Sequence, residues 1–171
     1  MIEIRQERES DYEEVGQVIK FAFASAEHCD GNEADLVANL RKSQAFIPEL
    51  SLVAVEQQKV IGHILFSKVK IGEKTELALA PLAVLPEYQR KGIGKSLIQE
   101  GHRIAQQLNY DYSIVLGSPD YYTKFGYIPA SQYQITAPFP VEDEFFMALK
   151  LNAKADAVNG VVEYDPAFGI C

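Results

Sequence analysis

Tryptophan is absent from this sequence, and cysteine, methionine and histidine are scarce. The 171 residues include two Cys, two Met and three His. The two cysteines, Cys29 and Cys171, lie far apart, and no Cys-x-x-Cys spacing occurs. A disulfide framework or a zinc site needs more cysteine and histidine ligands at closer spacing. We therefore expect free thiols and no metal site.

Long apolar runs and an excess of positive charge are also missing. No run approaches the roughly 18 apolar residues that a membrane-spanning helix needs, and the first residues show no secretory signal pattern. With 16 Lys and Arg against 24 Asp and Glu, the formal net charge is −8. Broad nucleic-acid binding needs a basic surface. We therefore expect a cytoplasmic protein that binds neither nucleic acid nor membrane.

The patterns that are present are typical of one mixed α/β domain. Alternating or continuous apolar residues predict strands at residues 2–7, 50–56, 60–71, 75–86, 112–118, 145–151 and 160–169. Helical spacing predicts helices at residues 12–23, 33–42, 93–108 and 119–126. Polar residues 57–59 read as a hairpin turn between two of the strands. The expected order is βααβββαβαβ, with one more strand at the end.

Pro81 lies inside the strand pattern of residues 75–86. Proline has no N–H group to donate to a neighbouring strand. The position therefore predicts a bulge or a splayed edge in this strand.

Residues 89–96 read QRKGIGKS and raise the question of a phosphate-binding loop. The stretch lies between a strand and a helix, where backbone N–H groups and the helix dipole can hold phosphate oxygens. A nucleotide-binding P-loop would need glycine at the place of Gln89, and a Rossmann turn would need a third glycine at the place of Leu97. Both alternatives fail, which leaves a loop for another phosphate ligand.

The pattern that fits is Gln-x-x-Gly-x-Gly, formed by Gln89, Gly92 and Gly94. Further downstream, YYTKFGY places Tyr122 four residues before Gly126. With these two motifs and its order of elements, the sequence resembles the GNAT N-acetyltransferase family, and most of all its YhbS-like bacterial subgroup.

The resemblance covers roughly residues 2–150 and implies the GNAT acyl-CoA N-acyltransferase fold, an α/β fold built on a mixed sheet. It divides the chain into a GNAT domain, residues 1–150, and a C-terminal extension, residues 151–171. We expect the extension to pack on the same domain as an added strand.

The resemblance also implies acetyl-CoA as cosubstrate and assigns residues to it. The backbone of Leu82, Ala83 and Val84 would hold the pantetheine arm and the thioester carbonyl. The pyrophosphate would lie on the loop formed by Gln89, Arg90, Lys91, Gly92, Ile93, Gly94 and Lys95. Ser118 occupies a place where the family often has an asparagine that contacts coenzyme A.

Tyr122 is the candidate general acid, because the resemblance places it where a phenol could protonate the departing thiolate. Tyr121 is a competitor, one position out of register. For the general base, Glu76 is the nearest carboxylate on the strand before the loop. His63 lies inside an apolar strand and reads as a core histidine. The base stays open, because a water relay or prior deprotonation of the amine would remove the need for it.

The resulting hypothesis is an enzyme that moves acetyl from acetyl-CoA to a primary amine by direct attack in a ternary complex. Cys29 and Cys171 show no context of a nucleophile, so an acyl-enzyme is not expected. The alternatives are an acyl-CoA-binding sensor or regulatory module without turnover and, with less support, an ATP-dependent enzyme. The acceptor stays open among small amines, aminoglycosides, polyamines and peptide or lysine amines. A homodimer formed through the terminal strand also stays open.

Overall fold

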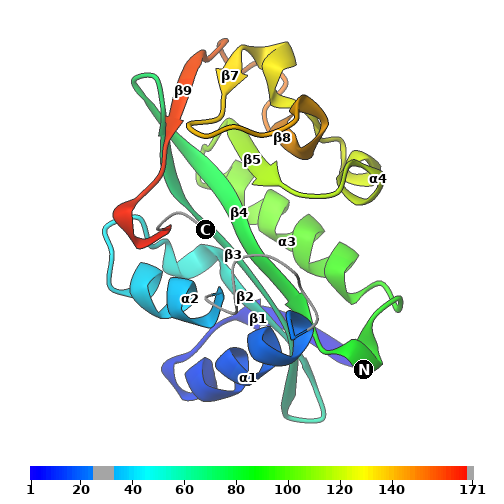
Figure 1. The fold of residues 1–171 in the computed structure, drawn as a ribbon. Helices are drawn as coiled ribbons and strands as arrows, with labels where there is room; N and C mark the ends of the chain where they lie inside the picture. Colours follow the sequence, from blue (N-terminus) through cyan, green and yellow to red (C-terminus); the bar gives the residue numbers. More distant parts are fainter. Residues whose placement is uncertain (25–32, 169–171) are drawn as a thin grey trace.

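The computed structural model describes residues 1–24 and 33–168, and within them a nine-stranded sheet carries four α-helices (Figure 1). Cys29 and Cys171 lie outside the described residues. The strands are β1 (Ile2–Gln6), β2 (Ser51–Glu56), β3 (Lys59–Ile71), β4 (Lys74–Val84), β5 (Tyr112–Leu116), β6 (Ile128–Pro129), β7 (Ile135–Thr136), β8 (Phe146–Lys150) and β9 (Gly160–Glu163). The helices are α1 (Tyr12–Ala22), α2 (Glu33–Arg41), α3 (Ile93–Gln107) and α4 (Pro119–Tyr122).

The order of the long elements confirms the expected mixed α/β fold. The strands follow the order β1-β2-β3-β4-β5-β8-β6 across the sheet, and along this path only β4 and β5 pair in parallel. The expected added strand is β9, which pairs with β3 through Lys70↔Glu163 and Ile71↔Val162. β6 and β7 were not expected, because two-residue strands contain no periodicity that a sequence pattern could reveal.

Helices cover both faces of the sheet. A Cβ added to Gly62 of β3 would meet Leu97 and Ile93 of α3 at 3.2 and 3.3 Å. The next residue, His63, therefore points to the opposite face, because successive side chains of a strand alternate. On that face α1 and α2 lie side by side (Figure 1), and the guanidinium carbon of Arg41 is 3.9 Å from the ring centre of Tyr12.

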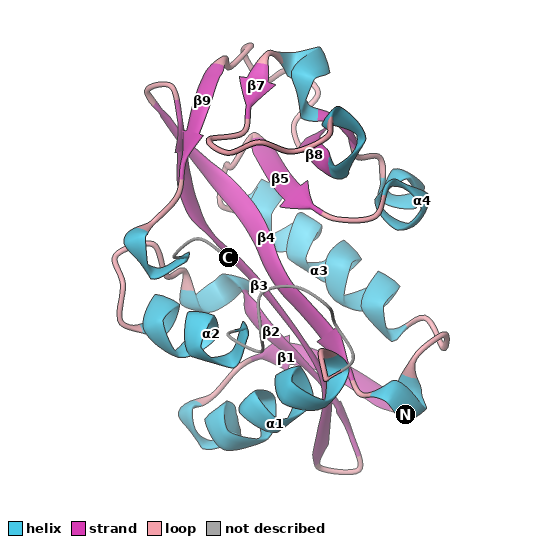
Figure 2. Ribbon diagram, viewed as in Figure 1, coloured by secondary structure: helices cyan, strands magenta, loops and turns pink. Residues whose placement is uncertain are grey.

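Strand β4 contains the bulge that Pro81 predicts. Ile64 pairs with Leu82 and Phe66 pairs with Leu79, so Ala80 and Pro81 together oppose one residue of β3. On its other side, β4 pairs with β5 only at Leu77↔Ser113 and Ala78↔Ile114. β4 and β5 then separate, and β5 leads toward α4 (Figure 2). The expected splay is therefore present directly after the paired segment.

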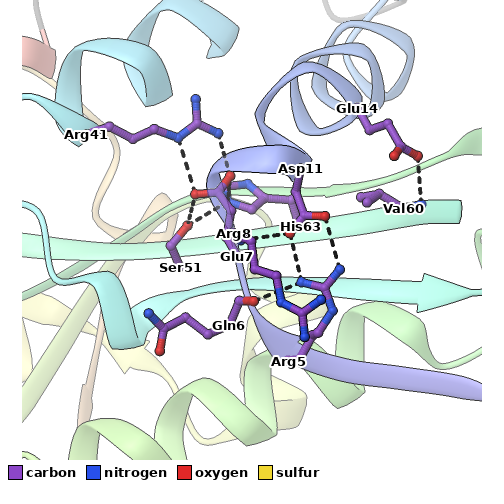
Figure 3. Close-up of polar contacts among 10 residues, drawn as sticks. All are labelled: Arg5, Gln6, Glu7, Arg8, Asp11, Glu14, Arg41, Ser51, Val60 and His63. Atoms are coloured by element: carbon purple, nitrogen blue, oxygen red, sulfur yellow. Dashed lines mark hydrogen bonds and ion pairs between the residues drawn. The ribbon is translucent and has the colours of Figure 1, made fainter. Parts of the chain in front are cut away.

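A buried polar cluster ties α2 to the sheet (Figure 3). Arg41 donates from Nε to Glu7 Oε1 at 3.2 Å and from Nη2 to Glu7 Oε2. The hydroxyl of Ser51 donates to Glu7 Oε1 at 2.8 Å and lies 3.1 Å from His63 Nε2. With its proton on Nε2, His63 donates to Ser51, and its Nδ1 has no partner among the described residues. Burial, followed by the charge of Arg41, lowers the pKa of His63 to about 3.

Candidate functional site

The loop that follows β4 has the backbone of an anion-binding turn. Gly92 is the N-cap of α3 with φ of +85°, and a Cβ there would meet no atom within 4 Å. Arg90 also has a positive φ of +64°. Successive turns of this kind point backbone N–H groups to one side, and those of the first turn of α3 have no partner inside the helix. The loop therefore presents donors at the positive end of the helix dipole.

Gln89 fixes this loop to the strand that precedes it. Its side-chain Nε2 donates to the carbonyl oxygen of Val84 at 3.0 Å. The family resemblance assigns Gln89 to the coenzyme-binding loop, and this contact shows that its amide also holds the loop at the end of β4.

Positive side chains surround the loop. Arg90, Lys91 and Lys95 are all exposed, and none forms an ion pair with another residue in the ranges 1–24 and 33–168. The ammonium of Lys91 lies 5.5 Å from the ring centre of Tyr88. The three charges are therefore available to an anionic ligand, although the chain as a whole is acidic.

The first turn of α3, strand β4 and helix α4 meet at one point. A Cβ added to Gly94 would be 2.6 Å from the hydroxyl oxygen of Tyr121 and 3.8 Å from Cδ2 of Leu82. Leu82 belongs to the segment of β4 that has separated from β5. The fold thus brings the predicted pyrophosphate loop, at Gly94, next to the strand segment predicted to hold the pantetheine arm, at Leu82.

Residues 82–84 pair with β3 along one edge of β4 and with no described residue of β5 along the other. In an antiparallel ladder, alternate residues turn their N–H and C=O groups away from the partner strand. The free edge is therefore a backbone surface on which an extended ligand can form hydrogen bonds.

Tyr122 lies at the open end of β5. A Cβ added to Gly117, just after β5, would be 2.6 Å from Cε2 of Tyr122, and the rings of Tyr122 and Tyr127 are 5.7 Å apart. The Tyr122 hydroxyl forms no hydrogen bond with another described residue. Burial, followed by the nearby Tyr121, raises its pKa above the usual range for tyrosine. The hydroxyl is therefore protonated at neutral pH.

Two other candidate site residues, Glu76 and Ser118, form contacts within the fold that give each of them a structural role. The carboxylate of Glu76 is almost fully buried, and its Oε1 accepts the N–H groups of Asp111 at 2.9 Å and Tyr112 at 3.2 Å. Burial is also the main cause that raises the pKa of Glu76. Ser118 is exposed and is the N-cap of α4, where its carbonyl oxygen accepts the N–H groups of the two tyrosines.

A separate surface cavity of about 480 Å³ lies beside the same, C-terminal end of β4. It is lined by α1, the start of β3 and residues 85–87, including Glu14, Phe21 and Glu87. None of the donor-site candidates lines this cavity, so we do not assign the catalytic groups to it.

Within residues 1–24 and 33–168, the structure holds no group of three or more His, Cys, Asp or Glu side chains arranged to bind a metal ion. In the same ranges, no helix has the length and apolar character needed to cross a bilayer.

Comparisons with known proteins agree with this geometry. The model of the acetyltransferase (GNAT) family matches residues 5–127. The uncharacterized N-acetyltransferase YjhQ of Escherichia coli K12 is 36% identical over 140 residues, which cover 79% of this chain and 75% of YjhQ. The uncharacterized N-acetyltransferase YhbS of the same strain is 34% identical over 140 residues, covering 80% of this chain and 83% of YhbS.

Two solved structures resemble the whole described chain. The crystal structure of YhbS from Escherichia coli in complex with CoA superimposes with a TM-score of 0.90 at 29% identity and covers 99% of this chain and 92% of that one. A GNAT family acetyltransferase from Brucella melitensis in complex with acetyl-CoA gives 0.81 at 33% identity and 98% coverage of both chains. The chain therefore belongs to the acetyltransferase (GNAT) family.

Proposed function

We propose that this protein transfers the acetyl group of acetyl-CoA to a primary amine by direct attack in a ternary complex. As a GNAT acetyltransferase it uses acetyl-CoA as cosubstrate, so the class of reaction follows from the family. The finer proposal depends on one observation. The free edge of β4, the glycine loop of α3 and the tyrosines of α4 lie next to one another.

The loop would bind the pyrophosphate of coenzyme A. Its first-turn amides provide oriented donors, and Arg90, Lys91 and Lys95 add unpaired positive charge. Gly92 permits the positive φ that the turn requires. A simple connection between a strand and a helix would need neither a glycine with positive φ nor a group of unpaired positive charges.

The pantetheine arm would extend along the free edge of β4 at Leu82, Ala83 and Val84. This edge offers backbone groups to the amides of the arm and an N–H group to the thioester oxygen. When the amine nitrogen attacks, the new C–N bond forms and negative charge develops on that oxygen. A fixed N–H donor stabilises such an oxyanion by about 2.7–4 kcal/mol in comparable sites.

The attacking nitrogen then carries one proton too many, which it releases to water, and water in turn restores the proton that the general acid gives up. Collapse of the tetrahedral intermediate breaks the C–S bond and leaves the electron pair on sulfur. Tyr122 is the proposed general acid that protonates the thiolate, because its hydroxyl keeps its proton and has no partner among the described residues. Its raised pKa makes it a weak acid in isolation. Desolvation also disfavours a free thiolate, so a proton donor next to the sulfur assists the departure of the thiolate.

The carboxylate of Glu76, the candidate base, already accepts two backbone N–H groups through Oε1. We therefore propose that the amine loses its proton before it attacks. An amine with a pKa of about 10 is mostly protonated at neutral pH, so the rate is expected to rise with pH.

The test combines binding and turnover. Acetyl-CoA should raise the melting temperature by mass action, and free thiol should appear with at least one member of a panel of amines. Tyr122→Phe should lower kcat by about a hundredfold and leave the affinity for acetyl-CoA unchanged. Tyr110→Phe, at the far end of α3, is the matched control for loss of a hydroxyl.

Two results would count against the proposal. Absence of any stabilisation by millimolar acetyl-CoA would exclude the donor site. Tight binding of acetyl-CoA without thiol release across the panel would favour a sensor or regulatory module. No observation on the described residues supports that alternative.

A further inference from the structure

Helix α4 ends with two adjacent tyrosines, Tyr121 and Tyr122, that contact different neighbouring elements. The ring of Tyr122 lies against Gly117 at the end of β5. The hydroxyl of Tyr121 instead lies against Gly94, in the first turn of α3, with Leu82 of β4 beside it. The register of the sequence motif selects Tyr122 alone, whereas the structure places Tyr121, too, against one of the predicted coenzyme-binding segments.

Aromatic neighbours hold the Tyr121 ring in a defined orientation. It packs edge to face on Tyr122, with ring centres 5.0 Å apart at 86°, and on Phe125 at 5.2 Å and 66°. The ammonium of Lys124 lies 5.9 Å from the ring centre. Such packing fixes the direction of the hydroxyl before any ligand arrives.

The Tyr121 hydroxyl is a donor without an assigned acceptor. Tyr121 is half-buried, and it forms no hydrogen bond with another residue of the described ranges. Burial raises the pKa of Tyr121, so the hydroxyl stays protonated at neutral pH. It points at the helix end where the backbone N–H groups of Ile93 and Gly94 also lack intrahelical partners.

We propose that Tyr121 binds the donor by donating a hydrogen bond to the phosphate of coenzyme A that is attached to the pantetheine arm. This inference rests on the proposed function. Leu82 marks the strand that would hold the arm, and Gly94 marks the turn that would hold the pyrophosphate. The hydroxyl lies where the two meet, which is the place of this phosphate.

The same contact gives Gly94 a second reason to be glycine. Even the smallest side chain would come within 2.6 Å of the Tyr121 oxygen, a distance that real Cβ atoms do not show. Gly94 therefore leaves room for the hydroxyl as well as for the approach of a phosphate to the backbone.

The experiment compares three acetyl donors with Tyr121→Phe: acetyl-CoA, S-acetyl-4′-phosphopantetheine and S-acetylpantetheine. The first two contain the phosphate in question, and the third lacks it. We expect KM to rise about tenfold for the first two, as for loss of one hydrogen bond to a charged group. KM for the third donor and kcat for all three should stay within about twofold of the unaltered protein.

Calorimetric binding of CoA and pantetheine, measured without an amine, separates this inference from the proposed function. A selective loss of CoA affinity in Tyr121→Phe would support the role of Tyr121 even where no amine is turned over. If the unaltered protein bound no CoA, both proposals would be overturned. An equal loss for CoA and pantetheine, or no loss, would overturn the inference alone.

Gly94→Ala provides a second variant that reaches the same contact from the other side. The added Cβ would displace the Tyr121 hydroxyl. With Tyr121 intact, Gly94→Ala should therefore weaken CoA binding strongly. In the Tyr121→Phe background the added loss should be clearly smaller, because the oxygen is already gone. Independent, additive losses would contradict the proposed contact.

Discussion

At the scale of single residues, buried polar groups in this protein differ in whether their hydrogen bonds are completed. Ser51 joins Glu7 and His63 within the cluster of Figure 3, where all three are almost completely buried. Ser67, on β3, is equally buried, but its hydroxyl has no partner among the described residues. The same residue type therefore has opposite energetic consequences at two places in one sheet.

Ser51→Ala should destabilise the protein by about 1–3 kcal/mol, because it leaves His63 without any partner and removes a donor from Glu7. Ser67→Ala is the matched control and should be neutral or slightly stabilising, since it removes an unpaired buried hydroxyl. Urea unfolding of both variants measures the two free energies. Equal losses would show that Ser67 has a partner, such as a buried water.

At the scale of elements, glycine has different roles in the two long helices. Gly16 lies inside α1, and a Cβ there would meet no atom within 4 Å. Gly92 has equally open surroundings, but it is the left-handed N-cap of α3 with φ of +85°. Space permits a methyl group at both places, and only the backbone conformation distinguishes them.

Gly16→Ala should therefore stabilise the protein by about 0.5–1 kcal/mol, because alanine loses less conformational freedom in a helix. Gly92→Ala should destabilise it by about 1–2 kcal/mol through the left-handed conformation. Gly92→Ala should also weaken CoA binding, whereas Gly16→Ala should not. Thermal unfolding of both variants, with and without CoA, measures stability and CoA binding for each. A stabilising effect of Gly92→Ala would contradict the left-handed conformation of this residue.

At the scale of the whole molecule, two histidines make stability depend on pH. Burial lowers the pKa of His63 to about 3 and that of His102 to about 4, from an ordinary value of 6.5. Both are neutral in the folded protein, whereas the unfolded chain takes up protons below pH 6.5. Their contribution is thus complete above pH 6.5 and is lost as pH falls toward the folded pKa values.

We expect the free energy of unfolding to fall by about 1.4 kcal/mol per histidine between pH 7.5 and pH 5.5. Urea unfolding at the two pH values measures this change. His102→Gln should roughly halve it, because glutamine can still hydrogen-bond the Tyr127 hydroxyl, 3.0 Å from His102 Nε2, without titrating. An unchanged pH dependence in the variant would rule out His102 as a source.

Much of this arrangement can be predicted from local patterns. The helices and long strands show hydrophobic periodicities that persist over many residues. Pro81 predicts the bulge of β4, because proline has no N–H group to donate. The glycine motif of residues 89–94 identifies the loop, and with it the family. The boundary between residues 1–150 and 151–171 and the homodimer remain predictions.

Other features could not be predicted, because they depend on residues distant in sequence. Tyr121 was set aside by its register, and only the packing of α4 against α3 places its hydroxyl on Gly94. Glu76 resembles a base on its strand, but the start of β5 supplies the two amides that occupy its carboxylate.

The class of fold and the order of the long elements follow from the amino-acid sequence, and so does the prediction of the donor loop. These depend on side-chain periodicity and on glycine or proline at particular positions, which are local properties of the chain. Only the folded arrangement shows which edge of β4 is left unpaired, which buried groups have partners, and that Tyr121 contacts Gly94 whereas Tyr122 contacts Gly117. Those outcomes depend on distances between separate elements, because hydrogen bonding and desolvation act only where folding brings groups into contact.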